Sequence, residues 1–325
     1  MRILVTGGAG YIGSHVAHLA NKKGYELVIV DDLSTGHKRA TPPNAVFVEG
    51  NVGDRELMEK VFRNERPEAV MHFAAHIEVE ESVHNPLKYY QNNTVNTLKL
   101  LETCIKHQVH RFIFSSTAAV YGTPQSLPVD ETSLVAPINP YGHSKAMSEQ
   151  ILKDLASSES AFRYVALRYF NVAGASGNGH IGQSYPNATH LIKVTAEVAT
   201  GQRQSLKVFG TDYDTVDGTC VRDYIHVDDI AQAHLDALDY LKNGGASDVF
   251  NCGYGHGTSV KEVIQAFENS TGVKIPFENA PRRAGDSEAL YSNNEKIKTV
   301  LGWRPQFDDL NYICKTAFDW ESKNR

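Results

Sequence analysis

The chain has 325 residues, of which 22% are charged and 41% are hydrophobic, and its net charge is −6. This composition is typical of a folded globular protein and excludes a disordered or fibrous chain, while the length favours about two domains. The net negative charge provides no global positive field that would draw the protein to nucleic acid or to an acidic membrane surface.

Short apolar runs rich in β-branched residues predict strands at 2–6, 26–30, 45–49, 69–73, 111–116 and 162–168. The segments between these runs have helical periodicity. Strands that alternate with helices favour a parallel sheet covered on both faces, because a parallel connection needs a crossover that is usually a helix. The sequence therefore predicts a doubly wound α/β domain.

The turn after the first strand carries three spaced glycines, Gly7, Gly10 and Gly13, in the stretch VTGGAGYIGSH. Glycines at such a turn allow a tight backbone path, close approach of a pyrophosphate to the main chain, and close packing of the next helix, whose N-terminus attracts phosphates. Asp31 follows Gly7 by 24 residues, at the end of the second strand. A carboxylate there accepts hydrogen bonds from an adenosine ribose and repels a 2′-phosphate. The pattern therefore predicts a Rossmann-type site for NAD rather than NADP.

The stretch PYGHSKAMSEQ places Tyr141 and Lys145 four residues apart. Residues at this spacing share one face of a helix, so the phenol and the ammonium group can meet the same ligand. A tyrosine with an unperturbed pKa of about 10 is a poor base at neutral pH, but a nearby lysine cation and an oxidised nicotinamide favour the phenolate. This pair is therefore a candidate acid-base site.

After residue 168 the alternation of strands and helices stops. Residues 171–187 and 209–219 are irregular, and loops of this length usually bind or cover a ligand. A helix predicted at 227–241 and a strand at 247–253 resemble core elements again. We therefore expect an NAD-binding domain over 1–170, rejoined by about 220–256, and a smaller mixed α/β lobe that binds substrate over 171–219 and 257–325.

Cysteine and histidine usage argues against a metal site or a redox dithiol. The four cysteines are scattered without a CxxC motif, and the histidines, such as His72, His76, His190 and His226, do not cluster at metal-ligand spacing. The chain opens directly on a strand without signal-peptide features, and it contains no run of about 20 apolar residues. A soluble cytoplasmic protein without a metal is therefore expected.

Seven motifs extend the pattern over nearly the whole chain: TGGAGYIGSH, YYQNNTVNTLKLLE, FSSTAAVYG, PYGHSK, LRYFNVAGA, DGTCVRDYIHVDD and RRAGD. On these motifs the chain resembles the extended branch of the short-chain dehydrogenase/reductase superfamily and, within it, the family of UDP-glucose 4-epimerases. The resemblance implies reversible 4-epimerisation of UDP-glucose and UDP-galactose. The catalytic tyrosine would remove the O4 proton, hydride would pass from C4 to bound NAD, and the 4-keto sugar would turn over before the hydride returns.

The resemblance also implies roles for individual residues. Thr117 would hydrogen-bond the reacting sugar oxygen and complete a catalytic set with Tyr141 and Lys145, with Ser116 as a supporting contact. The implied cofactor-binding residues are Gly7, Gly10, Tyr11, Ile12, Gly13, Asp31, Asp32, Asn51, Val52, Phe73, Ala74, Ala75, Asn92, Ser115, Tyr141, Lys145 and Tyr169. The implied substrate-binding residues are Thr117, Tyr141, Asn171, His190, Leu191, Val208, Phe209, Arg222, Arg283 and Asp286. The two arginines suit a diphosphate because a guanidinium forms two parallel hydrogen bonds, and the segment that ends at Phe209 would lie along the uracil.

Three positions bear on the cofactor and the substrate within this family. Asn51 stands where aspartate is usual near the adenine, and a small effect is expected because an amide can still bond the base edge. Ile77 stands where many members carry a polar or lysine side chain, so weaker NAD retention is expected from this position. Leu290 occupies the position whose bulk limits acceptance of an N-acetyl group, and leucine is intermediate in size. Epimerisation of UDP-N-acetylhexosamine, UDP-glucuronate or UDP-xylose is therefore left open as the alternative function.

The sequence argues against two rival activities. Sugar-nucleotide 4,6-dehydratases carry Asp-Glu after the catalytic hydroxyl, whereas Ala118 and Ala119 stand here and cannot transfer protons. A non-enzymatic NAD-sensing regulator typically loses the catalytic tyrosine or lysine, and both are present here.

The resemblance further implies a homodimer in which helices at about 86–107 and 139–157 pack into a four-helix bundle.

Overall fold

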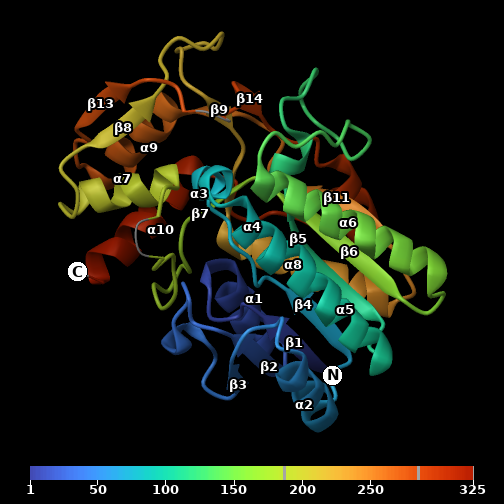
Figure 1. Cartoon of the computed structure of the whole chain (residues 1–325). Coiled ribbons are helices and arrows are strands. Elements are labelled where there is room, and N and C mark those ends of the chain that lie inside the picture. The colour runs from blue at the N-terminus through green and yellow to red at the C-terminus, as the bar shows by residue number, and fades with distance from the viewer. Residues whose placement is uncertain (186–187, 284–285, 325) are drawn as a thin grey trace.

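A seven-stranded parallel sheet forms the centre of the computed structural model, which describes residues 1–185, 188–283 and 286–324 (Figure 1). The strand order is β11-β6-β5-β4-β1-β2-β3, and every neighbouring pair is parallel. The strands are β1 (Arg2–Thr6), β2 (Glu26–Asp31), β3 (Val46–Glu49), β4 (Ala69–His72), β5 (Arg111–Thr117), β6 (Arg163–Tyr169) and β11 (Asp248–Cys252). The predicted doubly wound α/β fold of Rossmann type is confirmed, because the first six strands have the dinucleotide-binding order.

Helices cover both faces of this sheet, and the side chains of each strand alternate between two apolar cores. Ile3 and Val5 of β1 pack under α1 and α8, whereas Leu4 packs under α2, α5 and α6. Burial on both faces explains why the strands are continuous apolar runs. The helices are α1 (Tyr11–Lys22), α8 (Val227–Lys242), α2 (Arg55–Glu65), α5 (Asn96–Lys106) and α6 (Pro140–Ser158).

The six strands predicted in the first half of the chain all form, and two other expectations need correction. The helix expected over 86–107 is divided into α4 (Pro86–Tyr89), a π-helical segment η2 (Tyr90–Val95) and α5. Residues 171–173, expected to be irregular, form β7 (Asn171–Ala173), because β10 (Tyr224–His226), distant in the sequence, supplies a parallel partner.

A smaller lobe lies beside the main sheet, at the upper left of Figure 1, and α3 lies between the two. It contains a parallel pair of strands, a three-stranded sheet and three helices. Its elements are β8 (Leu206–Phe209), β13 (Phe277–Ala280), β9 (Val221–Arg222), β12 (Thr258–Ser259), β14 (Ala289–Leu290), α7 (Leu191–Ala199), α9 (Val260–Thr271) and α10 (Leu310–Lys323). The short connecting elements are η1 (Lys38–Ala40), α3 (Val79–His84), η3 (Ala118–Tyr121) and η4 (Ile297–Leu301).

All four cysteines are buried, and none forms a disulfide within the described chain. Within the same residues, no helix combines the length and apolarity needed to cross a membrane.

Candidate active site

The glycine-rich turn at the end of β1 fits closely against the loop that follows β4. Gly7 has a φ of +71°, and a Cβ atom there would lie 2.6 Å from the main-chain nitrogen of Ala74. A Cβ atom on Gly13 would lie 2.3 Å from the carbonyl oxygen of Gly7. Both positions therefore require glycine. Gly10 precedes α1 and has no side chain to cap it, which leaves the first N–H groups of the helix to a ligand, so this turn fits the pyrophosphate of NAD.

The acidic pair at the end of β2 is held by specific hydrogen bonds. The two carboxylate oxygens of Asp31 accept from the main-chain nitrogens of Ala9 and Leu33, each at 2.9 Å, and burial raises the pKa of this carboxyl. Asp32 accepts from Nδ2 of Asn51 at 2.9 Å. Asp31 therefore fixes the glycine turn, a role that its spacing did not indicate. The residues that follow, 33–39, line a hollow suited to the adenosine end of the cofactor.

Asn93, a residue that the sequence analysis did not single out, links η2, the loop after β4 and α6. Its Oδ1 accepts from the main-chain nitrogen of His76 at 2.9 Å, and its Nδ2 donates to the carbonyl of His76 at 2.9 Å and to Oγ of Ser144 at 3.1 Å. Asn93 is buried within η2. It thereby links the loop after β4, which contains the predicted cofactor residues 73–75, to α6. The only sequence signal was a pair of asparagines in an otherwise helical stretch.

The other predicted cofactor residues have structural partners of their own. The Tyr11 phenol donates to the carbonyl of Gly174 at 2.6 Å, which connects the glycine turn to the segment after β7. The Tyr169 phenol lies 2.5 Å from Nε2 of His234, which also packs against Phe73 with ring centroids 4.7 Å apart. Four more are placed by their elements: Ile12 packs partly buried on the core under α1, Val52 is buried under α2, Asn92 lies in η2, and Ser115 lies in β5.

Lys145 is anchored on the main chain of β5. Helix α6, which carries it, begins at Pro140 after Asn139, whose Oδ1 accepts from the nitrogen of Gly142 at 2.9 Å, a standard N-cap. The Lys145 ammonium donates to the carbonyl of Ser115 at 2.7 Å. Burial lowers the pKa of Lys145 to about 7, and the nearby Glu149 opposes this shift. Burial therefore disfavours the charged form of Lys145, and this amine can gain or lose a proton near neutral pH.

Tyr141 and Thr117 meet at the end of β5. Burial raises the pKa of the Tyr141 phenol, a hydrogen-bonding interaction with Thr117 opposes the rise, and the negative charge of Glu78 adds to it. Thr117 also caps η3, since its Oγ1 accepts from the nitrogen of Ala119 at 3.1 Å. The pair can pass a proton to and from a hydroxyl group that lies between them, provided that a nearby cation favours the phenolate.

Ser116 has a different role from the one expected, so its assignment as a supporting contact for the sugar is wrong. Strand alternation turns its side chain under α6, where its Oγ donates to Oε1 of Glu149 at 2.5 Å. Glu149 pairs with Nη2 of Arg168 at 2.6 Å, and Nη1 of Arg168 donates to the Tyr121 phenol at 2.9 Å. All four residues are buried. This network fixes the catalytic helix on β5 and β6.

The predicted UDP-binding residues gather where β8, β9 and the segment before β14 meet. Nε of Arg283 donates to Oδ2 of Asp286 at 3.1 Å, and its guanidinium lies 4.7 Å from the centroid of the Phe209 ring. Nη2 of Arg222 lies 4.0 Å from Oδ1 of Asp286. Two guanidinium groups beside one carboxylate leave a net positive charge, which suits a diphosphate. Residues 284–285 of the RRAGD motif lie outside the described part of the chain.

Three further substrate residues share one cavity, whereas Val208 lies elsewhere. Asn171, His190 and Leu191 line a cavity between β7, α7 and α10. Nδ1 of His190 is 3.0 Å from Nε2 of Gln183, and burial lowers the pKa of His190. Val208 is fully buried in the core under β8, so its side chain does not face a ligand and the expected contact needs correction.

The buried histidines have hydrogen-bonding roles, as expected. His72 lies between Oγ1 of Thr6 and Oγ1 of Thr97, at 2.6 and 2.8 Å, and Nδ1 of His226 accepts from the nitrogen of Asp228 at 3.1 Å. Within the part of the chain that the structure describes, no group of three or more His, Cys, Asp or Glu side chains could hold a metal ion.

Known proteins resemble this chain over nearly its whole length. Residues 3–253 match the profile of the NAD dependent epimerase/dehydratase family. The chain is 52% identical over 320 residues to a UDP-glucose 4-epimerase of Azospirillum brasilense, covering 98% of this chain and 92% of that protein. A solved UDP-glucose 4-epimerase from Bifidobacterium longum, in complex with NAD+ and UDP, is 40% identical with a TM-score of 0.96 and covers 100% of this chain and 99% of that one. The UDP-Glc/GlcNAc 4-epimerase of Campylobacter jejuni is 54% identical, with a TM-score of 0.87 over 99% of each chain.

Proposed function

This chain belongs to the NAD dependent epimerase/dehydratase family, and from that premise we propose that it interconverts UDP-glucose and UDP-galactose by epimerisation at C4, with NAD as cofactor. The observation that carries the proposal is the interaction of Tyr141 with Thr117 at the end of β5, the strand whose Ser115 carbonyl anchors the buried Lys145 side chain. The relative from A. brasilense is named for this reaction, and the B. longum structure contains NAD+ and UDP.

In the proposed reaction, Tyr141 holds the proton that moves. Its phenolate takes the proton from O4 of the sugar and returns it once the 4-keto sugar has turned over. Thr117 would position O4 against the phenol, and Lys145, when protonated, would lower the free-energy cost of a buried phenolate. When bound, NAD would supply the acceptor for the C4 hydride and, on its return, the donor.

We assign the UDP group to the cluster of Arg222, Arg283, Asp286 and Phe209. The guanidinium groups would grip the diphosphate, the Asp286 carboxylate would accept from a ribose hydroxyl, and Phe209 would lie along the uracil. The cavity beside His190 supports an extension of the substrate toward α7.

A second candidate substrate class is the UDP-N-acetylhexosamines. The relative from C. jejuni, at 54% identity, is named for both UDP-Glc and UDP-GlcNAc. Leu290, the residue expected to limit an N-acetyl group, is partly buried and packs on the small apolar cluster that includes Phe170 and Ala118. The name of this relative is therefore what favours the second class.

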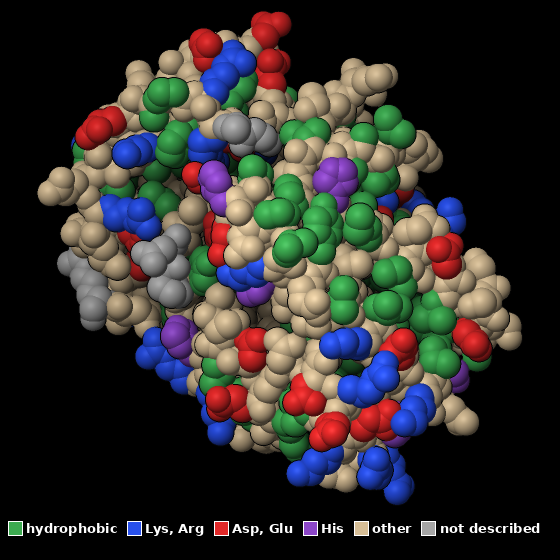
Figure 2. Space-filling model, in the orientation of Figure 1, with side chains coloured by type: hydrophobic (Ala, Val, Ile, Leu, Met, Phe, Trp, Pro, Cys, Tyr) green, Lys and Arg blue, Asp and Glu red, His purple; other side chains and the backbone are tan. Residues whose placement is uncertain are grey.

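We also propose that the protein is a homodimer. Leu87, Val95, Leu98 and Met147 are exposed on α4, η2, α5 and α6, and Leu87 is 77% exposed. Hydrophobic side chains gather over these elements in Figure 2, and a contiguous apolar patch marks an interaction surface. Two such helix pairs would form a four-helix bundle. Light scattering that reports only the mass of a single chain would overturn this proposal.

We also propose a division of the chain into two lobes and a location in the cytoplasm. We propose that residues 1–170 and about 220–256 form the NAD-binding domain, apart from β9, which pairs with β12 and β14 of the smaller lobe, and that 171–219 and 257–325 form the lobe that binds the nucleotide sugar. The four buried, unbridged thiols suit the reducing cytoplasm.

The first experiment is to incubate the purified protein with UDP-galactose and to resolve the products by NMR of the anomeric region. Conversion without added NAD is expected and would also show that the cofactor is retained. Conversion only with added NAD would support the reaction and indicate weak retention near Ile77, whose side chain is 43% exposed. Failure in both conditions would overturn the proposal for UDP-glucose, and the same assay with UDP-N-acetylglucosamine would then decide between the two candidate classes.

A further inference from the structure

We propose that Glu78 makes the sugar end of this site selective for uncharged UDP-sugars and against those that carry a C6 carboxylate, such as UDP-glucuronate. This inference rests on the proposed function and narrows its substrate class. Glu78 directly precedes α3, and neither its spacing nor a motif singled it out in the sequence.

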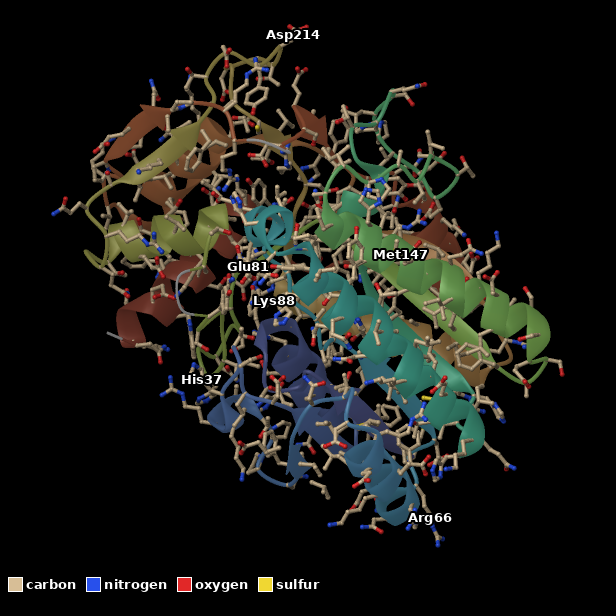
Figure 3. All side chains as sticks on the ribbon, in the orientation of Figure 1. His37, Arg66, Glu81, Lys88, Met147 and Asp214 are labelled. Carbon is tan, nitrogen blue, oxygen red and sulfur yellow. The ribbon has the colours of Figure 1, made fainter. Side chains whose placement is uncertain are left out.

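Glu78 lies at the junction of the two lobes. Helix α3 lies between the main sheet and the smaller lobe in Figure 1, and Figure 3 marks this junction with Glu81 of α3 and Lys88 of α4. Across the junction, Oε2 of Glu78 accepts a hydrogen bond from Oγ1 of Thr189 at 2.7 Å. Thr189 immediately precedes His190, which lines the cavity beside α7. The carboxylate therefore reaches from the NAD-binding side to the substrate side.

The second oxygen of this carboxylate is free to bind a ligand. Oε1 of Glu78 is buried and has no hydrogen-bond partner among the described residues. A buried carboxylate oxygen without a donor is costly, so it favours a ligand that brings a hydroxyl or N–H group to it. A neutral hexose or an N-acetylhexosamine carries such donors.

The charge of Glu78 acts directly on the groups that surround the reacting sugar. Burial is the main cause that raises the pKa of the Tyr141 and Tyr185 phenols, and the charge of Glu78 adds to both shifts; the same charge opposes the burial that lowers the pKa of His190. These residues come from α6 and from the segment that leads into α7. Since Tyr141 would hold O4, the hexose ring must lie within electrostatic reach of Glu78.

A C6 carboxylate would meet this charge, and Arg283, a cation that shares the surroundings of His190 with Glu78, is paired with Asp286 at 3.1 Å. The ammonium of Lys145 is buried and donates to the main chain of β5, and Lys88 pairs with Glu81 at 2.6 Å. Two like charges that face each other in an effective dielectric of about 20 repel enough to weaken binding on the order of 10- to 100-fold. A neutral sugar avoids this repulsion and also satisfies Oε1.

The test compares equilibrium binding of UDP-glucose and UDP-glucuronate by calorimetry in the wild type, in Glu78→Gln and in Glu80→Gln. Glutamine keeps the size of the side chain and removes its charge. Glu80 is an exposed carboxylate of α3 and is the matched control. The wild type and Glu80→Gln should both bind UDP-glucuronate at least about tenfold more weakly than UDP-glucose, and Glu78→Gln should narrow this ratio by about tenfold or more.

Binding of UDP alone reports whether each variant is folded. Equal binding of both sugars by the wild type, or an unchanged ratio in a Glu78→Gln protein that binds UDP normally, would overturn the inference. Glu78→Asp keeps the charge and should keep the discrimination, so loss of discrimination in this variant would also overturn it. The ratio of the two affinities could narrow in Glu78→Gln as expected while the wild type fails to convert UDP-galactose. In that case the proposed reaction is wrong, and the role of Glu78 in discriminating between the two sugars is supported.

Discussion

Replacement of Tyr141 by phenylalanine separates chemistry from binding. The substitution removes the phenol oxygen and leaves the ring, so the edge-to-face contact with Tyr89, with centroids 6.5 Å apart and an interplanar angle of 81°, is retained. The lost interaction with Thr117 costs about 1 kcal/mol of folding stability. Loss of a positioned acid-base group slows the reaction by about 10² to 10⁴-fold, or roughly 3 to 5 kcal/mol in the barrier. Turnover should therefore collapse, while the affinity for UDP changes by less than about threefold.

The assay for this variant is conversion of UDP-galactose, followed by NMR, together with calorimetric binding of UDP. Tyr25→Phe is the matched control, because its phenol bonds Asp239 at 3.2 Å on the far end of α8 and is not part of the site. Tyr25→Phe should convert substrate at the wild-type rate. A Tyr141→Phe protein that retains turnover within about tenfold would refute the assignment of the proton-transfer group, and so would a loss of turnover that only parallels a loss of UDP binding.

Two further predictions concern the glycine turn and the pH dependence of stability. Gly13→Ala should lower NAD affinity by about tenfold or more, because its Cβ atom would meet the carbonyl of Gly7 at 2.3 Å and displace the start of α1. Gly24→Ala is the control, because φ there is +84° and no described atom lies within 4 Å of the added Cβ. This variant should lose about 1 kcal/mol of folding stability and bind NAD as the wild type does. An equal loss of NAD affinity in Gly13→Ala and Gly24→Ala would contradict the steric argument. Burial and the neighbouring Asp229 raise the pKa of Asp228 to about 6, so its contribution to stability is present below pH 4 and is lost as the pH rises through 6. Asp228→Asn should therefore stabilise the protein in urea by about 1 kcal/mol more at pH 8 than at pH 5, and a gain independent of pH would show that the carboxyl titrates normally in the folded state.

Local patterns in the sequence were sufficient to predict the main sheet, the cofactor turn and the tyrosine-lysine pair. The apolar runs at 2–6 and 111–116 predicted β1 and β5 because burial on both faces imposes a continuous apolar strand. The glycine turn and the acid after β2 were predictable because tight turns and helix N-termini depend on a few adjacent residues. The spacing of Tyr141 and Lys145 placed both on one helix face by the period of the helix alone.

Tertiary packing decided which side chains reach the site and which do not. Ser116 and Thr117 are adjacent hydroxyls in the sequence, but Ser116 lies under α6 on Glu149, 33 residues away, and only Thr117 meets the phenol. Glu78 is hydrogen-bonded by Thr189, which is 111 residues away in the sequence and lies across the junction of the lobes. Periodicity and turn chemistry extend over a few residues, whereas these contacts depend on how distant elements pack against one another. The sequence by itself therefore determined the strands, the cofactor turn and the tyrosine-lysine pair, and only the tertiary structure decided the partners and the charge that surround the sugar.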